Sequence, residues 1–542
     1  MPIVPRLPSA SRPMRARGWL LALALPLAAA AQPAVLERGN GPEPSTLDAH
    51  RCQEIACGNV LRDLYEGLVT EDAHGRLIPG MAERWSVSAD GRTWTFVLRA
   101  GLKWSNGEPL DAHQVVASFR RAFAPATAAP FGELFEALEN ARAVQAGQLP
   151  PHRLGVHAPD ARTVVFRLTR SAPVPALLTL PIAFPVYLPA VQRFGAQHTR
   201  PGTLVGNGAY RLAAWTPQAN LLVERNPHFH DAGNVAIARV RFHVTEDAAA
   251  ELQRFAAGDL HITETVPPQP LPALRRRFGR QLVITPYLGA FWLGLNLTRP
   301  PFRDDPALRE ALSLAIDRDR LTRHVTGFGE TPAYGIVPPG IPGYVPARIA
   351  WASHTQAERV AHARALYRRA GYSASQPLTI ELRYNTSTPH RRLALAVAAM
   401  WRETLGVRVR LRNEEWKVFV GNRKQRAITQ AFRGGWIGDV ADACNFLAAF
   451  GSDGPLNWTG YDDPGFRERL ERADAARSEA ARNAWLRAAE QRLLNAHAVI
   501  PLYFYTSKHL VAPNVRGFAP NTLDRHASRW MRLAPHVRGV RR

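Results

Sequence analysis

At 542 residues this chain is too long to fold around one hydrophobic core, because single cores stop growing at about 250–300 residues. We therefore expect two or three lobes. Hydrophobic residues make up 46% of the chain and charged residues 21%, which is an ordinary globular composition. This composition excludes a disordered or collagen-like protein.

The first residues have the three-part pattern of a secretory signal peptide. Arg12, Arg15 and Arg17 precede an apolar run from Trp19 to Leu27, and four alanines follow it. The run is about half of the ~20 residues that a membrane-spanning helix needs, so we expect residues 1–31 to be cleaved. The first cysteine, Cys52, is too far downstream for lipid attachment, and the mature protein is expected to be soluble in the periplasm. Met1 and Met14 are both candidate starts.

The formal net charge of +23 raises the question of a nucleic-acid partner. Only four of the 68 basic residues are lysines, and the arginines are scattered along the chain apart from short clusters such as residues 275–277. Phosphate binding favours basic residues gathered on one face. We therefore expect no nucleic-acid partner.

Three cysteines, Cys52, Cys57 and Cys444, are too few for a disulfide framework. Export permits one bridge, and Cys52 and Cys57 are the closest pair in sequence. One thiol is then left unpaired or pairs between chains.

Local patterns alternate between strands and helices. An Asp-Gly turn at Asp90 precedes aromatic and β-branched residues at 93–98, which predicts a strand. Asp111 is a candidate N-cap for a helix with apolar residues at helical spacing. Further on, a strand at 380–384, a helix and a strand at 407–411 predict a parallel unit. Parallel sheets build clefts at their strand ends, so we expect an α/β protein with a cleft.

Motifs of common catalytic and nucleotide-binding sites are absent from the sequence. There is no Gly-x-x-x-x-Gly-Lys, no His-Glu-x-x-His and no Gly-x-Ser-x-Gly. A catalytic triad assembled from distant residues has no such signature. We expect a protein that is not an enzyme and needs no cofactor or metal.

Seven sequence blocks carry a resemblance to a known family. In chain order they are RDLYEGLV (62–69), MAERWSVSADGRTWTFVLRAGLKWSNGEPLDAHQVVASFRR (81–121), NGAYRL (207–212), TPAYG (331–335), YNTS (384–387), EEWK (414–417) and GGWIGD (434–439). Together they are similar to the extracellular solute-binding proteins of family 5, which serve peptide and nickel ABC transporters, and most of all to its oligopeptide-binding members.

The resemblance implies a periplasmic-binding-protein-like α/β fold of type II, cluster C. Two α/β lobes close on a ligand, and an extra third lobe is added. By analogy lobe I is discontinuous and comprises residues 34–69, 199–288 and 506–542. Lobe II, the extra lobe, spans 70–198, and lobe III spans 289–505.

The resemblance also implies how a peptide's amino end and main chain are held. Asp439 matches the family aspartate that pairs with the α-ammonium, and losing one partner of such a buried pair costs about 3–5 kcal/mol. Gly434 and Gly435 lie in a candidate exposed strand that adds the ligand as a further strand. Trp436 and Trp416 are candidate walls of side-chain pockets. A surface aspartate and core tryptophans are the alternatives.

For the carboxylate end the resemblance implies Arg433, Arg423 and His390, since a guanidinium fits a carboxylate. The alternative for the arginines is a solvated surface charge. Asn385 is a candidate for bonding the ligand main chain or for capping a turn. Cys57 occupies the place of a family glutamate that helps to bind the peptide. The amino end is therefore expected to be held less strongly, or a different ligand to be selected.

Two further positions depart from the family pattern. A family lysine appears here as Thr326. A disulfide of some members falls at Gly289 and Ile437 and cannot form. These departures leave the expected fold unchanged and affect the expected range of ligands.

The implied function is that of the periplasmic substrate-binding component of an ABC transporter. It captures short oligopeptides and delivers them, as a monomer, to the inner-membrane permease and its ATPase subunits. Two alternatives stay open. One is a receptor specialised for a single ligand, such as a murein peptide, a dipeptide, glutathione or a nickel chelate. The other is a ligand sensor or chaperone on the same fold.

Overall fold

A computed structural model describes residues 34–267, 269–451, 454 and 457–535. The predicted signal peptide and both candidate start residues lie outside the described residues. No helix within the described ranges is long and apolar enough to cross a membrane.

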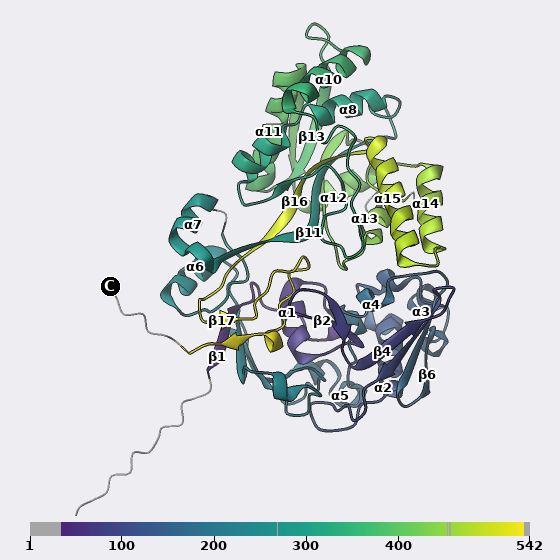
Figure 1. The fold of residues 1–542 in the computed structure, drawn as a ribbon, viewed down its shortest axis with the longest axis vertical. Coiled ribbons are helices and arrows are strands. Elements are labelled where there is room, and N and C mark those ends of the chain that lie inside the picture. The colour runs from purple at the N-terminus through teal and green to yellow at the C-terminus, as the bar shows by residue number, and fades with distance from the viewer. Residues whose placement is uncertain (1–33, 268, 452–453, 455–456, 536–542) are drawn as a thin grey trace, which may run out of the picture. The chain divides into compact units, whose positions relative to one another are not determined.

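Three sheets of four or more strands organise the described residues (Figure 1). Sheet A has the strand order β1-β10-β9-β8, sheet B the order β4-β5-β7-β6, and sheet C the order β12-β16-β11-β15-β13-β14. The strands of sheets A and B are β1 (Val35–Gly39), β8 (Tyr210–Thr216), β9 (Asn220–Arg225), β10 (Arg239–His243), β4 (Ala82–Val87), β5 (Thr93–Leu98), β6 (Val156–Asp160) and β7 (Thr163–Arg167). The strands of sheet C are β11 (Leu282–Leu295), β12 (Thr331–Pro332), β13 (Thr379–Asn385), β14 (Arg408–Glu414), β15 (Ala431–Ile437) and β16 (Val499–Leu510). Two small pairs are β2 (Val69–Glu71) with β3 (Leu77–Pro79) and β17 (Val515–Arg516) with β18 (Arg532–Leu533).

Helices surround these sheets. They are α1 (Ile55–Leu64), α2 (Ala112–Phe123), α3 (Ala141–Gln145), α4 (Val174–Leu177), α5 (Leu188–Phe194), α6 (Ala248–Ala257), α7 (Leu271–Phe278), α8 (Pro306–Leu314), α9 (Arg318–Arg320), α10 (Gln356–Arg369), α11 (Thr388–Leu405), α12 (Trp416–Gln425), α13 (Cys444–Leu447), α14 (Pro464–Asp474) and α15 (Glu479–Asn495).

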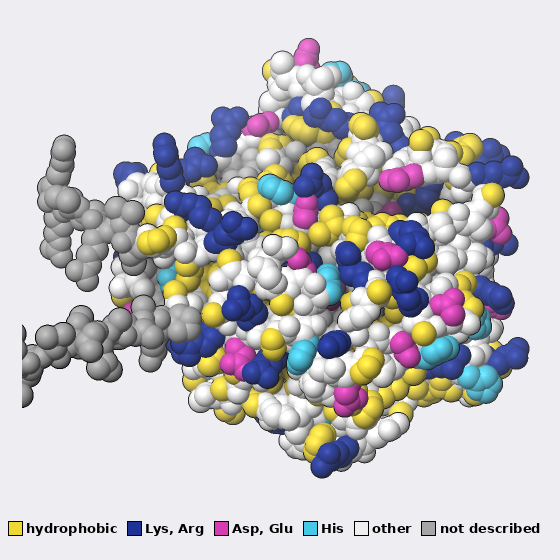
Figure 2. All heavy atoms as spheres, turned by 60° about the horizontal axis from the view of Figure 1, so that its bottom comes forward, with side chains coloured by type: hydrophobic (Ala, Val, Ile, Leu, Met, Phe, Trp, Pro, Cys, Tyr) yellow, Lys and Arg dark blue, Asp and Glu magenta, His cyan; other side chains and the backbone are white. Residues whose placement is uncertain are grey.

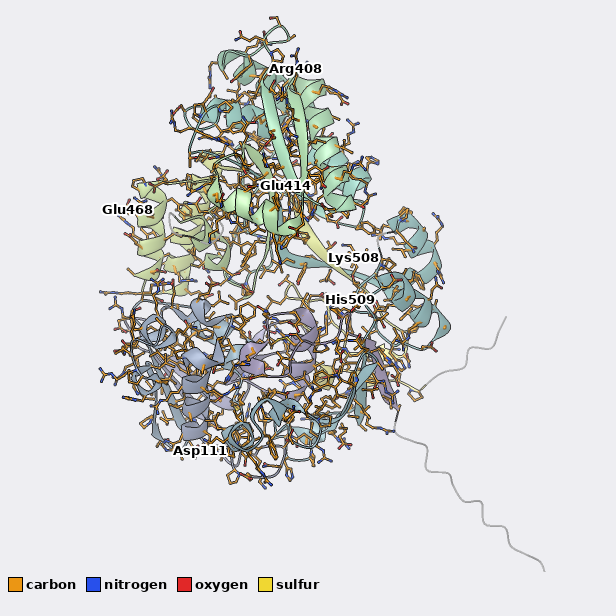
Figure 3. All side chains as sticks on the ribbon, turned by 180° about the vertical axis from the view of Figure 1, so that it is seen from behind. Asp111, Arg408, Glu414, Glu468, Lys508 and His509 are labelled. Atoms are coloured by element: carbon orange, nitrogen blue, oxygen red, sulfur yellow. A yellow bond between two sulfur atoms is a disulfide. The ribbon has the colours of Figure 1, made fainter. Side chains whose placement is uncertain are left out.

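The local predictions are confirmed. Strand β5 occupies the predicted residues. Asp111 caps α2 through a capping box, in which its side chain accepts from Gln114 N at 2.9 Å and Gln114 Oε1 accepts from Asp111 N at 3.2 Å. Figure 3 labels Asp111 at this helix start. Strands β13 and β14 are parallel and are joined by α11, as the pattern predicted. The chain is an α/β protein.

Each large sheet has its own buried core, as expected for a chain of this length. Sheet A packs Val240 and Phe242 into one cluster, and sheet B packs Phe96 and Phe166 into another. Sheet C is covered on its two faces by separate clusters, one of which contains Leu382. Burial of these apolar side chains is the main stabilising term in such a fold.

Two long strands connect sheet C with the neighbourhood of sheet A. Strands β11 and β16 run side by side (Figure 1), and their register shifts between Pro286 and Ala290. Beyond that shift, Leu510 at the end of β16 accepts from Thr263 N at 3.0 Å. Ile262 bridges β1, so this end of the pair is attached to sheet A.

Candidate functional site

Strand β15 has a free edge over most of its length. It pairs with β11 along all seven of its residues. With β13 it pairs at Ala431 and Phe432 and at no later residue. On the β13 side, residues 433–437 therefore have no strand partner among the described residues. Such an edge can pair with an extended ligand.

The two glycines of this edge are required by packing. A Cβ at Gly434 would lie 2.5 Å from Nε1 of Trp292, and a Cβ at Gly435 would lie 2.9 Å from Oη of Tyr505. A side chain at either position would displace a neighbouring aromatic residue. The glycines thus keep both aromatic side chains in place beside the free edge.

Arg433, the first residue of the free edge, belongs to a polar cluster. Its Nε donates to Asn385 Oδ1 at 2.8 Å, and His390 Nδ1 donates to the same oxygen at 2.8 Å. Asn385 ends β13, and His390 lies in the first turn of α11. The fold therefore brings three of the candidate residues together from three elements.

Aromatic rings surround the two arginines of the site. Cζ of Arg433 lies 5.2 Å from the Trp416 ring centroid and 5.3 Å from that of Phe419. Cζ of Arg423 lies 5.0 Å from the Phe419 centroid and 3.2 Å from that of Trp458. These are cation–π distances. The side chain of Trp416 is 50% exposed, so part of its surface is open to a ligand.

Neither arginine has an acidic partner within the described part of the chain. Burial, together with the nearby positive charge of Arg433, lowers the pKa of Arg423 to about 9. Burial also lowers the pKa of Arg433. Burial, together with the positive charge of Arg433, also lowers the pKa of His390 to about 4. At neutral pH the two arginines are therefore uncompensated cations, whereas His390 is neutral and contributes a hydrogen bond.

Asp439 lies just beyond the other end of β15. Its main-chain N donates to Asn445 Oδ1 at 3.0 Å, and Trp436 Nε1 donates to the same oxygen at 3.2 Å. Nη2 of Arg525 donates to the Asp439 main-chain oxygen at 2.5 Å, while Nη1 of Arg525 pairs with Glu71 at 2.8 Å. Burial raises the pKa of the Asp439 carboxyl. No ion pair joins this carboxylate to a cation in the described residues.

Cys57 is separated from this constellation. It forms a disulfide with Cys52, it has no exposed surface, and it packs in the core below sheet A. The side chain at position 57 points into the core and offers no thiol to a ligand. This corrects the expectation that Cys57 lies among the ligand-binding residues. Cys444 is the free cysteine, and burial raises its pKa to about 11.

Four residues that position the site were missed by sequence reasoning: Asn445, Arg525, Tyr505 and Phe291. The Phe291 ring lies 5.7 Å from the His390 ring and 6.3 Å from the Tyr505 ring. Asn445 follows the GGWIGD block by six residues, which is a usable signal. The other three lie far from the blocks in sequence.

One group among the described residues has metal-ligand spacing, namely His509, Asp524 and His526. Nε2 of His509 and Nε2 of His526 both lie within hydrogen-bond distance of Asp524 Oδ1, at 2.8 and 3.0 Å. Nδ1 of His509 donates to the Thr263 main-chain oxygen at 2.9 Å. Hydrogen bonds within the protein thus account for these groups.

A cavity of about 370 Å³ adjoins the Asp439 end of the site. Val440 and Ala441 line it from one side, and Trp94 and Thr179 line it from the other. Its size is within the range of small-molecule pockets.

Basic side chains are not gathered into a stripe on the face shown in Figure 2. Arginine and lysine side chains are spread there among acidic and apolar ones.

Comparison with known proteins gives concordant results. Residues 76–458 match the model described as bacterial extracellular solute-binding proteins, family 5 Middle. The chain is 36% identical to the periplasmic oligopeptide-binding protein OppA of Salmonella typhimurium over 489 residues, 89% of each chain. It is 35% identical to the periplasmic murein peptide-binding protein MppA of Escherichia coli over 497 residues, 91% of this chain and 92% of the relative.

Solved structures agree with these matches. The unliganded open form of MppA superimposes with a TM-score of 0.86 at 34% identity, covering 94% of this chain and 99% of that one. The Haemophilus influenzae OppA complex with the peptide RPPGFSPFR gives a TM-score of 0.73 at 32% identity, covering 93% and 100%.

Proposed function

This chain belongs to family 5 of the bacterial extracellular solute-binding proteins, and we propose that it captures short oligopeptides in the periplasm for an ABC transporter. The peptide is delivered to the inner-membrane permease, whose ATPase subunits supply the energy. The protein acts as a monomer, binds without changing its ligand chemically, and needs no cofactor. The names of its relatives, OppA and MppA, support a peptide ligand.

One observation carries the proposal: a single strand edge joins two unpaired charges of opposite sign. Arg433 begins the free edge of β15, and Asp439 lies just beyond its end. From Arg433 to Ile437 the edge spans about 13 Å at ~3.3 Å per residue. A zwitterionic peptide of about four residues matches this length, with its carboxylate at the arginines and its ammonium at Asp439.

The main chain of β15 supplies affinity that does not depend on the ligand's side chains. The aromatic residues beside the edge, Trp416 and Trp436, border the space for those side chains. Asn385 orients Arg433 and offers its side-chain amide to the ligand's carboxyl end. Arg423 adds a second cation behind Phe419.

Ligand capture is proposed to close the lobes about β11 and β16. The separate sheets support lobes at residues 34–69 with 199–288 and 506–542, at 70–198, and at 289–505. Closure is a population shift that the ligand drives through contacts available in the closed state.

Native mass spectrometry of the secreted protein, followed by denaturation, tests this function. A ladder of mixed peptides a few residues long is expected, and Asp439→Ala should carry much less peptide. A single released species would favour the specialised receptor instead, an alternative supported by the murein-peptide name of one relative. A protein that stays empty after mixing with a peptide library would refute peptide capture.

A further inference from the structure

Helix α1 keeps exposed surface on one face, and Cys57 lies on another side of the helix. The residues of α1 that retain exposed surface are Ile55, Asn59 and Arg62, which share one helix face at spacings of four and three. Cys57 is fully buried on another side. Arg62 lies within electrostatic range of Arg525, the residue that bonds the Asp439 main chain. Position 57, the place of the family glutamate, therefore carries no carboxylate, and the exposed residues of α1 supply none.

A carboxylate from the loop between α6 and α7 contacts this face. Oε2 of Glu264 accepts a hydrogen bond from Nδ2 of Asn59 at 3.0 Å. The two residues before Glu264 are bonded to β1 and to the end of β16, which holds the main chain in place. No ion pair joins Glu264 to a cation among the described residues.

The charged groups that face Glu264 are His509, Asp524, Arg38 and Glu251. The two cations are engaged elsewhere. His509, labelled in Figure 3, is paired with Asp524 at 2.8 Å, and Arg38 donates to oxygens of the C-terminal segment. Burial raises the pKa of Glu264 to about 7 despite these cations. The carboxylate thus lacks a cation of its own.

Tyr287 and its neighbour Leu288 link the surroundings of Glu264 to those of Asp439. The Tyr287 hydroxyl is within electrostatic range of both Glu264 and Arg525. Arg525 bonds the Asp439 main chain at 2.5 Å. Leu288, the residue after Tyr287, accepts a hydrogen bond at 2.7 Å from the glycine that precedes Asp439.

We propose that Glu264 is a second carboxylate for the ligand's amino group and takes over the role that the resemblance gives to a glutamate at position 57. Glu264 binds the ammonium from the side of sheet A, and Asp439 binds it from the side of sheet C. An ammonium has three N–H donors, enough for both. The shared ammonium stabilises the closed state because the two carboxylates belong to regions joined by β11 and β16. This inference rests on the proposed function and narrows the ligand class to peptides with a free amino end.

Isothermal titration calorimetry with tri-alanine and N-acetyl-tri-alanine tests the role of Glu264. Glu264→Gln keeps an oxygen for Asn59 and is expected to weaken tri-alanine binding about tenfold or more, with binding of the acetylated peptide unchanged. Glu224→Gln, a change of the same type in an ion pair on β9, is the matched control and should bind like the wild type. Tri-alanine bound by Glu264→Gln as tightly as by the wild type would overturn the inference, and the proposed function would stand.

The unmodified protein provides a second measurement that is independent of how well the variant folds. Because Glu264 ionises near pH 7, affinity for tri-alanine should rise about eightfold from pH 6 to pH 7.5, and binding at pH 7 should release a proton. An affinity that is flat over this range, without proton release, overturns the role of Glu264. A wild-type protein that binds neither tri-alanine nor any peptide of a mixed pool overturns the proposed function, and the inference with it.

Discussion

Replacing Arg433 with methionine should separate the recognition of a ligand carboxylate from the stability of the fold. Methionine keeps much of the apolar contact with Trp416 and Phe419 and removes the charge and the bond to Asn385. In the ligand-free protein this also removes the repulsion between Arg433 and Arg423. The melting temperature of the ligand-free variant should therefore equal or exceed that of the wild type.

Ligand binding should respond in the opposite direction. Truncating one member of a buried charge pair costs about 2–5 kcal/mol, which is about 30- to 4,000-fold in affinity at 1.4 kcal/mol per tenfold. Since Arg423 still supplies one cation on the other side of Phe419, we expect the lower end, about 30- to 100-fold.

Calorimetry with tri-alanine and its C-terminal amide measures this effect. The wild type should prefer the free acid, and Arg433→Met should lose most of that preference. Arg408→Met, at an exposed arginine at the start of β14 (Figure 3), is the matched control and should behave like the wild type. An equal loss of affinity for acid and amide, or a fall in melting temperature that accompanies it, would refute a carboxylate-binding role.

Three further predictions concern stability. Replacing Cys52 and Cys57 together with serine should lower the free energy of unfolding by about 2 kcal/mol, because the disulfide closes a short loop. Denaturant unfolding measures this loss. Peptide affinity should not change if position 57 faces the core. Asp442→Asn should lower the free energy of unfolding by about 3–5 kcal/mol, because Asp442 forms a buried two-point ion pair with Arg482 at 2.6 and 2.9 Å. An unchanged denaturation midpoint would contradict the pairing. The melting temperature should fall as the pH is lowered from 6.5 to 4.5, since four buried or partly buried histidines take up protons in the unfolded chain near pH 6.5 but in the folded protein only near pH 4. A melting temperature that stays constant over this range, measured by circular dichroism, would disprove that these histidines are neutral in the folded protein. These histidines are His50, His390, His497 and His526.

Much of the local structure was predictable because it depends on neighbours in the chain. The capping box at Asp111 needs two residues three positions apart, and the strand at 93–98 needs one turn and a run of suitable side chains. The βαβ unit from β13 to β14 follows from hydrophobic periodicity in the same way. Block similarity predicted the family, which the comparisons confirmed.

The tertiary structure also checks the register of the resemblance. Gly289 and Ile437, inferred as the positions of a disulfide in some family members, lie directly opposite each other in β11 and β15. Such cross-strand neighbours can be recognised by block similarity but not by spacing, since they lie far apart in the chain.

The sequence by itself determined the class of fold, the family and the chemical types of side chain available for a ligand. The tertiary structure decided which of these side chains meet. Asn385, His390 and Arg433 come together from three elements, and Cys57 is directed into a core. It also decided that Arg433, Asp439 and Glu264 lack ion partners in the described residues. The physical reason is that burial and electrostatic interaction depend on distances between residues remote in sequence, whereas turns, caps and periodicity depend on adjacent ones.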